Sequence, residues 1–514
     1  MLLKTTIKRS WNFQFLRNSH MKIYGIVVAV CLSGSIASAT SSKTPDAATN
    51  LNLTVLDTYG SNHRMATDAG GNVYLAGYKT GSDGTDDYNV VKLDSDLNVQ
   101  WEKLYRYKKG YSDVPRAIGV DSLGNVYVTG GSHKPGVPDV AITVKYSNSG
   151  TKLWSRNLFA SASGGAPGVS SRAVIHTNAT ITAKRAYVEK IARSELNPNL
   201  AYDHSLDVSW STLEGSATAL IVDSSNNVFV SGYGSRFAGP DTGLDIIVAK
   251  YAPDGTRNWR KEVDGGSKAA DTPKALALDG PSVIVAGDSQ TTLGANRDFI
   301  ILKYNTNGVP LFQSHVGPGA PQDYVLRAVA VNSKTHDIFV SGFDSLDYRG
   351  VTAKLDGSGG VAASSTTTTA GRFNDAVMDT AGYFISVGEG NNPANCGAVR
   401  TNAQKVQDLT TTWDEIYNIG TGTGADAGYA LATLSGGGPL IFVTGSAYDG
   451  GGWRMALAGI VRNTNTPKWT WINSGSGPAL ERGLAIATAT SDCLYAVGNT
   501  GSGSKVVKIC DISD

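Results

Sequence analysis

The sequence lacks the motifs that mark the most common catalytic centres. It has no His-Glu-x-x-His pair for zinc, no Gly-x-Ser-x-Gly nucleophile turn, no Gly-x-x-x-x-Gly-Lys-Ser/Thr phosphate loop and no Cys-x-x-Cys-His haem attachment site. The histidines beyond residue 39 have no second histidine or carboxylate at metal-ligand spacing; they stand at 63, 133, 176, 204, 315 and 336. The sequence therefore leaves any catalytic residue unknown, and it predicts no metal ligand set.

An excess of charge of either sign is also absent, because 45 Lys and Arg residues balance 44 Asp and Glu residues and leave a net charge of +1. Such a chain has no long-range field to concentrate polyanions, so nothing in its composition supports nucleic acid or a charged membrane surface as a partner. No stretch after residue 32 is long and apolar enough to span a bilayer. We therefore expect no membrane span in the mature chain.

The first 39 residues have the pattern of an export signal. Basic residues at 4, 8, 9, 17 and 22 precede an apolar run over 23–32, and Ala37-Ser38-Ala39 supplies the small residues that signal peptidase needs. We predict a signal peptide over 1–39, a flexible leader over 40–52, and a secreted, extracellular or periplasmic protein. Translation could begin at Met1 or at Met21.

Cysteine is scarce, and only Cys396, Cys493 and Cys510 lie beyond the predicted signal peptide. Cys493 and Cys510 flank two strand-like segments, and pairing residue 497 with 506 would place these two cysteines opposite each other. A cross-strand disulfide and two buried thiols are both compatible with this pattern. Cys396 is expected in a loop.

Glycine, in contrast, is abundant at 60 residues, and it punctuates a repeat. The stretch Gly71-Asn72-Val73-Tyr74-Leu75-Ala76-Gly77 recurs as an alternating strand that ends in glycine. The closing glycines are Gly77, Gly130, Gly232, Gly287, Gly342, Gly388, Gly445 and Gly498. The interval between Gly130 and Gly232 is about twice the others.

Each unit contains three further strand-like segments around this one. One precedes it, as at 116–121, and one follows it with a basic residue, as at Val144-Lys145-Tyr146. An aromatic residue then opens a fourth segment nine positions after the lysine; these residues are Trp101, Trp154, Trp259 and Phe312. Four strands in each repeat predict an all-β propeller made of four-stranded blades.

The double interval leaves the number of blades at eight or nine. Residues of about 165–215 fit either a degenerate ninth blade or a helical insert, since Ala183 to Leu196 is rich in helix-forming residues. With the ninth unit, the basic position falls at 92, 145, 190, 250, 303, 354, 400, 462 and 508. The last unit ends after its third strand, so we predict that Leu53 to Asp57 closes the ring as its fourth strand within a propeller over 53–514.

Residues 53–510 resemble the bacterial SBBP β-propeller repeat family, in which a Gly-Asn-Val-Tyr-Val-Thr-Gly strand precedes a Val-Val-Lys-Leu-Asp strand and then Gly-x-x-x-Trp. Gly124 to Gly130, Val144 to Tyr146 and Gly150 to Trp154 carry the resemblance. It implies a propeller fold outside the cytoplasm and no single activity. A weaker similarity links the chain to NHL-type and quinoprotein propellers.

The recurring Trp and Lys residues are interpreted as structural. A tryptophan at a fixed place in each blade suits packing between blades, and each lysine can pair with an aspartate such as Asp68, Asp121, Asp223 or Asp279. Turn carboxylates at Asp83, Asp86 and Asp87, and around Asp94, could offer oxygen atoms to calcium. Apart from possible calcium, we predict no cofactor.

In a propeller, the loops after the second and fourth strands lie on one face, and here they are long and varied. Function is expected on that face. The predicted binding residues are Tyr107, Tyr111, His133, Arg236, Arg297, Tyr348, Arg349 and Trp453, with Asp347 and Tyr448 beside them. The first hypothesis is a non-catalytic, monomeric scaffold that binds a glycan or a cell-envelope protein. The alternative is a polysaccharide lyase, a lactonase or a quinone-dependent dehydrogenase with its site in the central channel.

Overall fold

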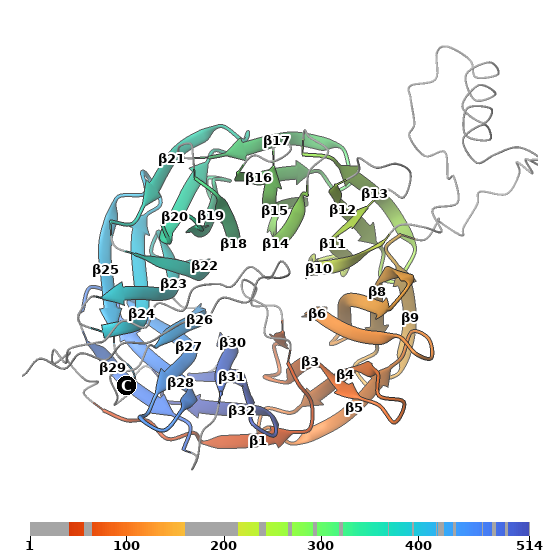
Figure 1. Ribbon diagram of the computed structural model, residues 1–514, viewed down its shortest axis with the longest axis horizontal. Helices are drawn as coiled ribbons and strands as arrows, with labels where there is room; N and C mark the ends of the chain where they lie inside the picture. The colour runs from red at the N-terminus through yellow and green to blue at the C-terminus, as the bar shows by residue number, and fades with distance from the viewer. Residues whose placement is uncertain are drawn as a thin grey trace, which may run out of the picture.

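The chain forms a ring of eight four-stranded antiparallel sheets around a central axis (Figure 1). The computed structural model describes residues 41–55, 64–159, 214–235, 243–265, 270–290, 296–317, 322–368, 370–392, 395–417, 419, 426–434, 438–464, 466–474, 480–488 and 492–512. Within these ranges the regular structure is entirely β, and no helix there could cross a membrane. The molecule is thus an eight-bladed β-propeller.

The blades follow one another in sequence, and we number them from the N-terminus. Blades 1 to 4 comprise β2 (Met65–Thr67), β3 (Val73–Thr80), β4 (Asp86–Leu93) and β5 (Val99–Tyr105); β6 (Ser112–Val120), β7 (Val126–Lys134), β8 (Val137–Tyr146) and β9 (Lys152–Asn157); β10 (Glu214–Val222), β11 (Val228–Ser235), β12 (Leu244–Tyr251) and β13 (Arg257–Val263); and β14 (Thr272–Asp279), β15 (Ser282–Gln290), β16 (Arg297–Tyr304) and β17 (Pro310–Val316).

Blades 5 to 8 comprise β18 (Tyr324–Val331), β19 (Ile338–Asp344), β20 (Arg349–Leu355) and β21 (Val361–Thr366); β22 (Gly371–Met378), β23 (Tyr383–Asn392), β24 (Asn395–Lys405) and β25 (Thr411–Tyr417); β26 (Ala427–Thr433), β27 (Leu440–Tyr448), β28 (Trp453–Val461) and β29 (Pro467–Ile472); and β30 (Arg482–Thr488), β31 (Cys493–Thr500), β32 (Gly503–Cys510) and β1 (Ala47–Leu51).

The recurring glycine ends the alternating part of each second strand because a bulged first strand covers it. In blade 2 the register of β6 and β7 shifts between Pro115 and Ala117, opposite Gly130. A Cβ at Gly130 would collide with the backbone of Val114 and Pro115. The same shift occurs opposite Gly287 in blade 4 and Gly342 in blade 5. The glycine is therefore required by the close approach of two backbones.

The prediction of a possible ninth blade is wrong, because blades 2 and 3 pack directly on each other. Trp154 of β9 and Leu220 of β10 share one hydrophobic cluster, and the Trp154 indole donates a hydrogen bond to the carbonyl of Pro253 in blade 3 at 3.1 Å. This contact leaves no place between them in the ring. The helical insert considered for 165–215 falls outside the described residues up to 213, as do the signal peptide and Arg236.

An N-terminal strand closes the ring, as predicted, but the residues differ. β1 pairs with β32 from Ala47 opposite Lys508 to Leu51 opposite Ser504, so residues 47–51 are not a flexible leader. Leu53 and Val55, which the sequence pattern predicts in the closing strand, instead lie in the core beside blade 1. The outermost strand of a blade is half-exposed and need not be apolar, so the more apolar segment takes the buried position.

The two C-terminal cysteines form the cross-strand disulfide that was one of the two possibilities. Cys493 lies opposite Cys510 in the pairing of β31 with β32, and their sulfur atoms are bonded. The disulfide joins two neighbouring strands in the blade that closes the ring. Cys396 lies in β24 rather than in a loop.

The recurring Trp and Lys residues bind the next blade, which confirms their structural interpretation. Lys145 Nζ and Trp154 Nε1 both donate to the carbonyl of Pro253, at 2.9 and 3.1 Å. Gly255, with φ of 84°, leaves room for the Trp154 ring, since a Cβ there would lie 2.8 Å from Trp154 Cγ. Lys250 Nζ and Trp259 Nε1 likewise both donate to the carbonyl of Thr306 in blade 4.

The expected pairing of these lysines with aspartates occurs in blades 2, 3 and 4. The distances are 3.5 Å for Lys145–Asp121, 3.9 Å for Lys250–Asp223 and 2.7 Å for Lys303–Asp279. The prediction that Arg400 and Arg462 occupy the lysine position in blades 6 and 7 is wrong, because strand pairing places other residues there. Strand pairing places Ala403 and Gly459 at that position in blades 6 and 7.

Candidate binding site

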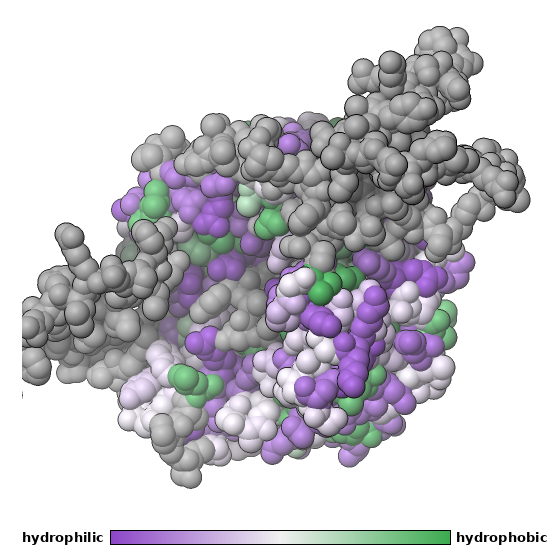
Figure 2. Space-filling view, turned by 45° about the vertical axis from the view of Figure 1, so that its right-hand side comes forward, coloured by the Kyte–Doolittle hydropathy of each residue, from purple (hydrophilic) through white to green (hydrophobic). Residues whose placement is uncertain are grey.

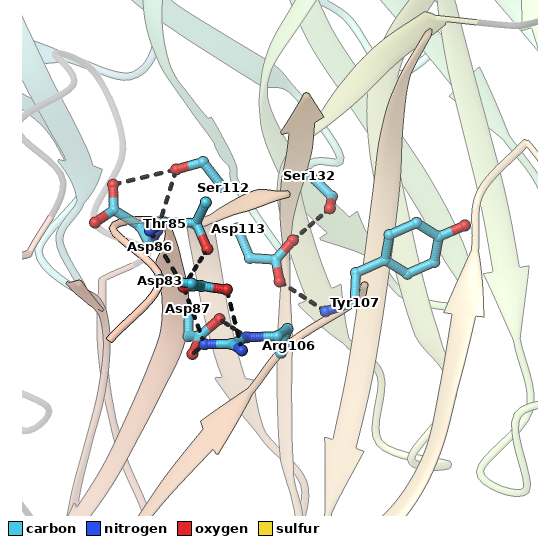
Figure 3. Close-up of polar contacts among 9 residues, drawn as sticks. All are labelled: Asp83, Thr85, Asp86, Asp87, Arg106, Tyr107, Ser112, Asp113 and Ser132. Carbon is cyan, nitrogen blue, oxygen red and sulfur yellow. Dashed lines mark hydrogen bonds and ion pairs between the residues drawn. The ribbon is translucent and has the colours of Figure 1, made fainter. Parts of the chain in front are cut away.

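The richest polar cluster on the long-loop face lies where blades 1 and 2 meet. It surrounds the segment 106–111, which connects the outermost strand β5 to the innermost strand β6 of the next blade. Figure 3 shows its carboxylates, hydroxyls and guanidinium converging from β4, the β3–β4 loop, β6 and β7. Tyr107 belongs to the same segment, but its ring points away from the polar cluster (Figure 3).

Arg106 holds two acidic side chains at this junction. Its Nε and Nη2 donate to the two carboxylate oxygens of Asp87 at 2.8 and 2.9 Å, and its Nη1 lies 3.2 Å from Asp83 Oδ2. Asp87 is buried, and a buried carboxylate needs such a partner to remain charged. The guanidinium therefore neutralises the acidic end of β4.

Asp113 binds the backbone of the connecting segment 106–111. This fully buried carboxylate accepts hydrogen bonds from the Ser132 hydroxyl and from the Tyr107 amide, the latter at 2.7 Å. Burial raises the pKa of Asp113 to about 6, although both hydrogen bonds act in the opposite direction. Nearby, Ser112 Oγ donates to Asp86 Oδ2 at 3.2 Å.

These contacts commit the charged groups of the cluster to one another and to the connecting segment. Asp83, Asp87 and Asp113 each accept hydrogen bonds from protein donors, and Arg106 is committed to two of them. A general base must reach a substrate proton, and a nucleophile must adjoin such a base. The geometry instead fixes the segment 106–111 on the ring.

The segment so fixed carries the first two predicted binding residues. The rings of Tyr107 and Tyr111 meet edge to face, with centroids 5.4 Å apart and an interplanar angle of 87°. Lys108 Nζ lies 4.8 Å from the Tyr107 ring centroid, and Lys134 Nζ lies 5.6 Å from that of Tyr111. We call Tyr107, Lys108, Tyr111 and Lys134 the tyrosine-lysine patch.

The remaining predicted residues do not join this patch. His133 is exposed and lies 2.5 Å from Asp139 within blade 2. Arg297 is held by Asp323 at 2.6 Å in the connection between blades 4 and 5. The sequence-predicted residues thus form separate groups around the ring.

Two of those groups contain aromatic residues. The Tyr348 hydroxyl donates to Glu389, which also forms an ion pair with Arg372 at 2.6 Å. Arg349 lies opposite Asp344 in the ladder of blade 5. Trp453 packs edge to face on Tyr448 at 5.7 Å in blade 7. Asp347 accepts from Gln322 at 3.4 Å.

Several residues of these sites escaped the sequence analysis. Three of them, Asp113, Lys134 and Arg372, lie inside strands. A charged residue in a strand pattern is normally interpreted as one that faces solvent. One signal for Asp113 is present in the sequence: Asp113-Val114-Pro115 recurs as Asp271-Thr272-Pro273, and both aspartates are buried.

The carboxylates considered for calcium are engaged by protein donors. Asp94 accepts from the backbone amides of Asp96 and Asn98, both at 2.9 Å, as in an ordinary polar turn. Asp83 and Asp87 are held by Arg106, and Asp86 Oδ1 accepts from Thr80 at 2.7 Å. Calcium binding at these positions stays a prediction.

The family model that matches this chain covers the end of the connection from blade 1 and the first two strands of blade 2. Residues 109–133 match the SBBP β-propeller repeat. This match and the fold bear out the resemblance seen in the sequence. A comparison with curated proteins gives no match.

Solved structures resemble the chain in fold at low sequence identity. The quinohemoprotein alcohol dehydrogenase from Comamonas testosteroni aligns with a TM-score of 0.51 and 13% identity, over 93% of this chain and 78% of its own. A europium-containing methanol dehydrogenase aligns with a TM-score of 0.50 and 10% identity, over 90% of this chain and 93% of its own. At these identities the likeness shows the propeller fold alone.

Proposed function

We propose that this protein is an extracytoplasmic, monomeric, non-catalytic scaffold that binds an anionic glycan through its tyrosine-lysine patch. The observation that carries the proposal is the pairing of two tyrosine rings and the Lys108 ammonium group on a segment that buried Asp113 holds in place, beside Lys134 of β7. A rigid scaffold that presents a variable loop is the usual setting for recognition. The chain needs no cofactor for this role.

The chemistry of the patch suits a sugar that carries carboxylate or sulfate groups. The half-buried Tyr107 ring offers flat apolar surface and a hydroxyl, and the buried Tyr111 ring supports it from inside. Lysine ammonium groups can leave a ring face to bind an anion. Lys109 follows Lys108 in the same exposed segment and adds a third ammonium group. Repeating anionic sugars could contact several of these groups at once.

The surface itself favours a ligand of this kind over a large apolar partner. In the view of Figure 2, hydrophilic residues surround small hydrophobic areas, and no broad apolar area appears among the coloured residues. Extensive apolar patches are typical of stable protein interfaces. An envelope protein is therefore the second kind of ligand to be distinguished by experiment.

Location outside the cytoplasm is supported by two features. The first 39 residues have the composition of a signal peptide. Cys493 and Cys510 form a disulfide, and structural disulfides persist in oxidising compartments.

The proposal is tested with a glycan array probed by the purified mature chain. We expect binding to acidic polysaccharides that falls about tenfold or more in a Tyr107→Ala/Lys108→Ala variant, on the scale of one lost hot-spot contact. Tyr448→Ala/Trp453→Ala removes a comparable edge-to-face pair from blade 7 and should leave binding unchanged.

Other outcomes would contradict the assignment. Equal losses in both double variants would remove the patch from the binding site. Binding only to an envelope protein in a cell-surface pull-down would replace the glycan as ligand, and turnover of a bound polysaccharide would favour the alternative of a propeller enzyme.

A further inference from the structure

A second junction between blades, that of blades 3 and 4, brings three carboxylates together. One oxygen atom from each of Asp245, Asp264 and Asp271 lies within 4.8 Å of the others. Asp245 lies in β12, Asp264 directly follows β13, and Asp271 directly precedes β14. Oxygen atoms that bind one calcium ion at about 2.4 Å are separated by such distances.

This junction is the structural counterpart of the one that holds Arg106. Asp87 precedes Tyr88, which pairs with Tyr105, and Asp245 precedes Ile246, which pairs with Val263. The residues that follow these outer partners are Arg106 in blade 1 and Asp264 in blade 3. An acidic residue thus stands where the other junction has a cation.

The third acid is also equivalent in the two junctions. Asp113 and Asp271 each stand two residues before a proline, Pro115 or Pro273, that lies opposite the recurring glycine. Asp271 Oδ2 accepts from the Gly265 amide at 2.6 Å, as Asp113 does from Tyr107. The two junctions therefore share the buried acid and the backbone amide that it binds, while the residue after the outer strand has the opposite charge.

Two buried oxygen atoms at the second junction point to a missing partner. Asp271 and Ser289 are both fully buried, and neither Asp271 Oδ1 nor Ser289 Oγ has a hydrogen-bond partner among the described residues. Both atoms face Gly265, where an added Cβ would lie 2.6 Å from Asp271 Oδ1 and would collide with Ser289 Oγ. Leaving such atoms without a partner is costly.

The electrostatics of Asp271 agree with this geometry. Burial raises its pKa, and the charge of Asp264 acts in the same direction, whereas the nearby Ser289 hydroxyl and the Gly265 amide lower it. Ser289 is close enough to influence the carboxylate, and neither Asp271 Oδ1 nor Ser289 Oγ has a hydrogen-bond partner among the described residues. His315 of blade 4 is close enough for its charge to favour the ionised form.

We propose that Asp245, Asp264, Asp271 and the Ser289 hydroxyl form a divalent-cation site, of calcium class, that joins blade 3 to blade 4. Carboxylate and hydroxyl oxygens are hard ligands, and calcium accepts them in irregular geometry together with water. The ion takes the electrostatic place that the Arg106 guanidinium has between blades 1 and 2. Asp245 and Asp264 also make other polar contacts, with which the ion competes.

The site is tested by titrating the metal-depleted full chain with CaCl2 and, separately, with MgCl2, following thermal unfolding and heat of binding. We expect calcium to raise the unfolding temperature with a dissociation constant of about 10⁻⁶ to 10⁻³ M and magnesium to act more weakly. Asp264→Asn should weaken calcium binding about tenfold or more, because it removes one charged ligand. Asp408→Asn changes an exposed turn aspartate of blade 6 and should leave the titration unchanged.

A charge-reversal variant gives a sharper test. Asp264→Arg recreates the residue of the blade 1–2 junction, so the variant should unfold at or above the temperature of the calcium-free wild type and should no longer respond to calcium. If Asp264→Asn fails to fold, Asp245→Asn takes its place in the titration. Wild-type protein that shows no calcium response, or a variant that titrates like it, would overturn the proposal.

Discussion

At the scale of single residues, buried aspartates at or just before the start of a blade's first strand explain how long loops are held on this ring. Asp113 fixes the Tyr107 amide, Asp271 fixes that of Gly265, and Asp426 fixes that of Ile419 at 2.7 Å. A carboxylate that accepts backbone hydrogen bonds in a buried place stabilises one loop conformation. The cost is a charge removed from water.

That cost predicts a pH dependence for Asp113. The folded-state pKa of about 6 lies above the ordinary value of 3.8, so the folded state binds the proton more tightly than the unfolded state. This carboxyl therefore costs nothing below about pH 4, and its contribution to the free energy of unfolding falls as the pH rises from 4 to 6. Asp113→Asn keeps an acceptor for Tyr107 and a donor for Ser132 but cannot titrate.

The measurement is urea unfolding of both proteins at several pH values. Wild-type stability relative to Asp113→Asn should fall by roughly 2–3 kcal/mol between pH 4 and 6, from about 1.4 kcal/mol per pKa unit. The difference between the proteins isolates Asp113 from the other carboxylates. Parallel profiles over this range would show that Asp113 does not titrate there.

Residue roles were the part of the molecule least accessible to sequence. The pattern of Trp154, Lys145 and Gly150 repeats, so its structural role could be predicted from repetition alone. Tyr107 and Tyr111 could be placed on the functional face, but their mutual contact depends on how Asp113 folds the segment. The role proposed for Asp264 could be inferred only after strand register showed that Arg106 is the corresponding residue of another blade.

At the scale of elements, the unit of cohesion is the contact between a fourth strand and the β-turn of the next blade. Trp154 has 7% of its surface exposed, stacks on Gly255 and donates to Pro253. Trp154→Ala should cost about 3–5 kcal/mol in the free energy of unfolding, the usual range for a buried aromatic residue. Chemical unfolding measures it, and a cost near zero would contradict the role given to this ring.

Gly255 should be as sensitive as the tryptophan that covers it. Gly255→Ala introduces a Cβ at a φ of 84° and 2.8 Å from Trp154 Cγ, so strain and collision add. Gly84→Ala is the matched control, because φ is 77° and no atom lies within 4 Å of an added Cβ. We expect about 1 kcal/mol for the control and at least twice that for Gly255→Ala. Equal costs would remove the steric part of the explanation.

Element positions were predicted well where alternation and turn residues coincide, as at 126–130 or 228–232. They were missed where the strand is polar. Ala47–Leu51 has no apolar alternation, since its strand lies at the outer rim with every second residue exposed. Arg400 was misaligned for a different reason: blade 6 has Ala403 in the lysine position, and only hydrogen-bond register shows this.

At the scale of the whole molecule, the ring depends on β1. It covers the free edge of β32 through five paired residues, and Lys43 and Asp46 add contacts to residues near the C-terminus. Deletion of residues 1–52 should lower the free energy of unfolding by about 3 kcal/mol or more, at roughly 0.5–1.5 kcal/mol for each lost hydrogen bond. The exposed edge should also favour self-association.

Thermal unfolding and size-exclusion chromatography of this deletion, beside a deletion of residues 1–40, check the prediction. The shorter deletion retains β1 and serves as the control. Indistinguishable unfolding and monomeric elution of both would show that the closing strand is dispensable.

The closing strand also sets an order in time. Among the described strands, β1 leaves the ribosome first, yet its partner β32 is the last to be made, and contacts such as Lys43 with Asp511 link positions 468 apart. During synthesis the other blades can form from neighbouring segments, while β1 has no partner until the chain is complete. The slow step of folding should therefore be the docking of β1, and a chain stopped short of β32 should form the first seven blades but leave the eighth unfinished and the ring open.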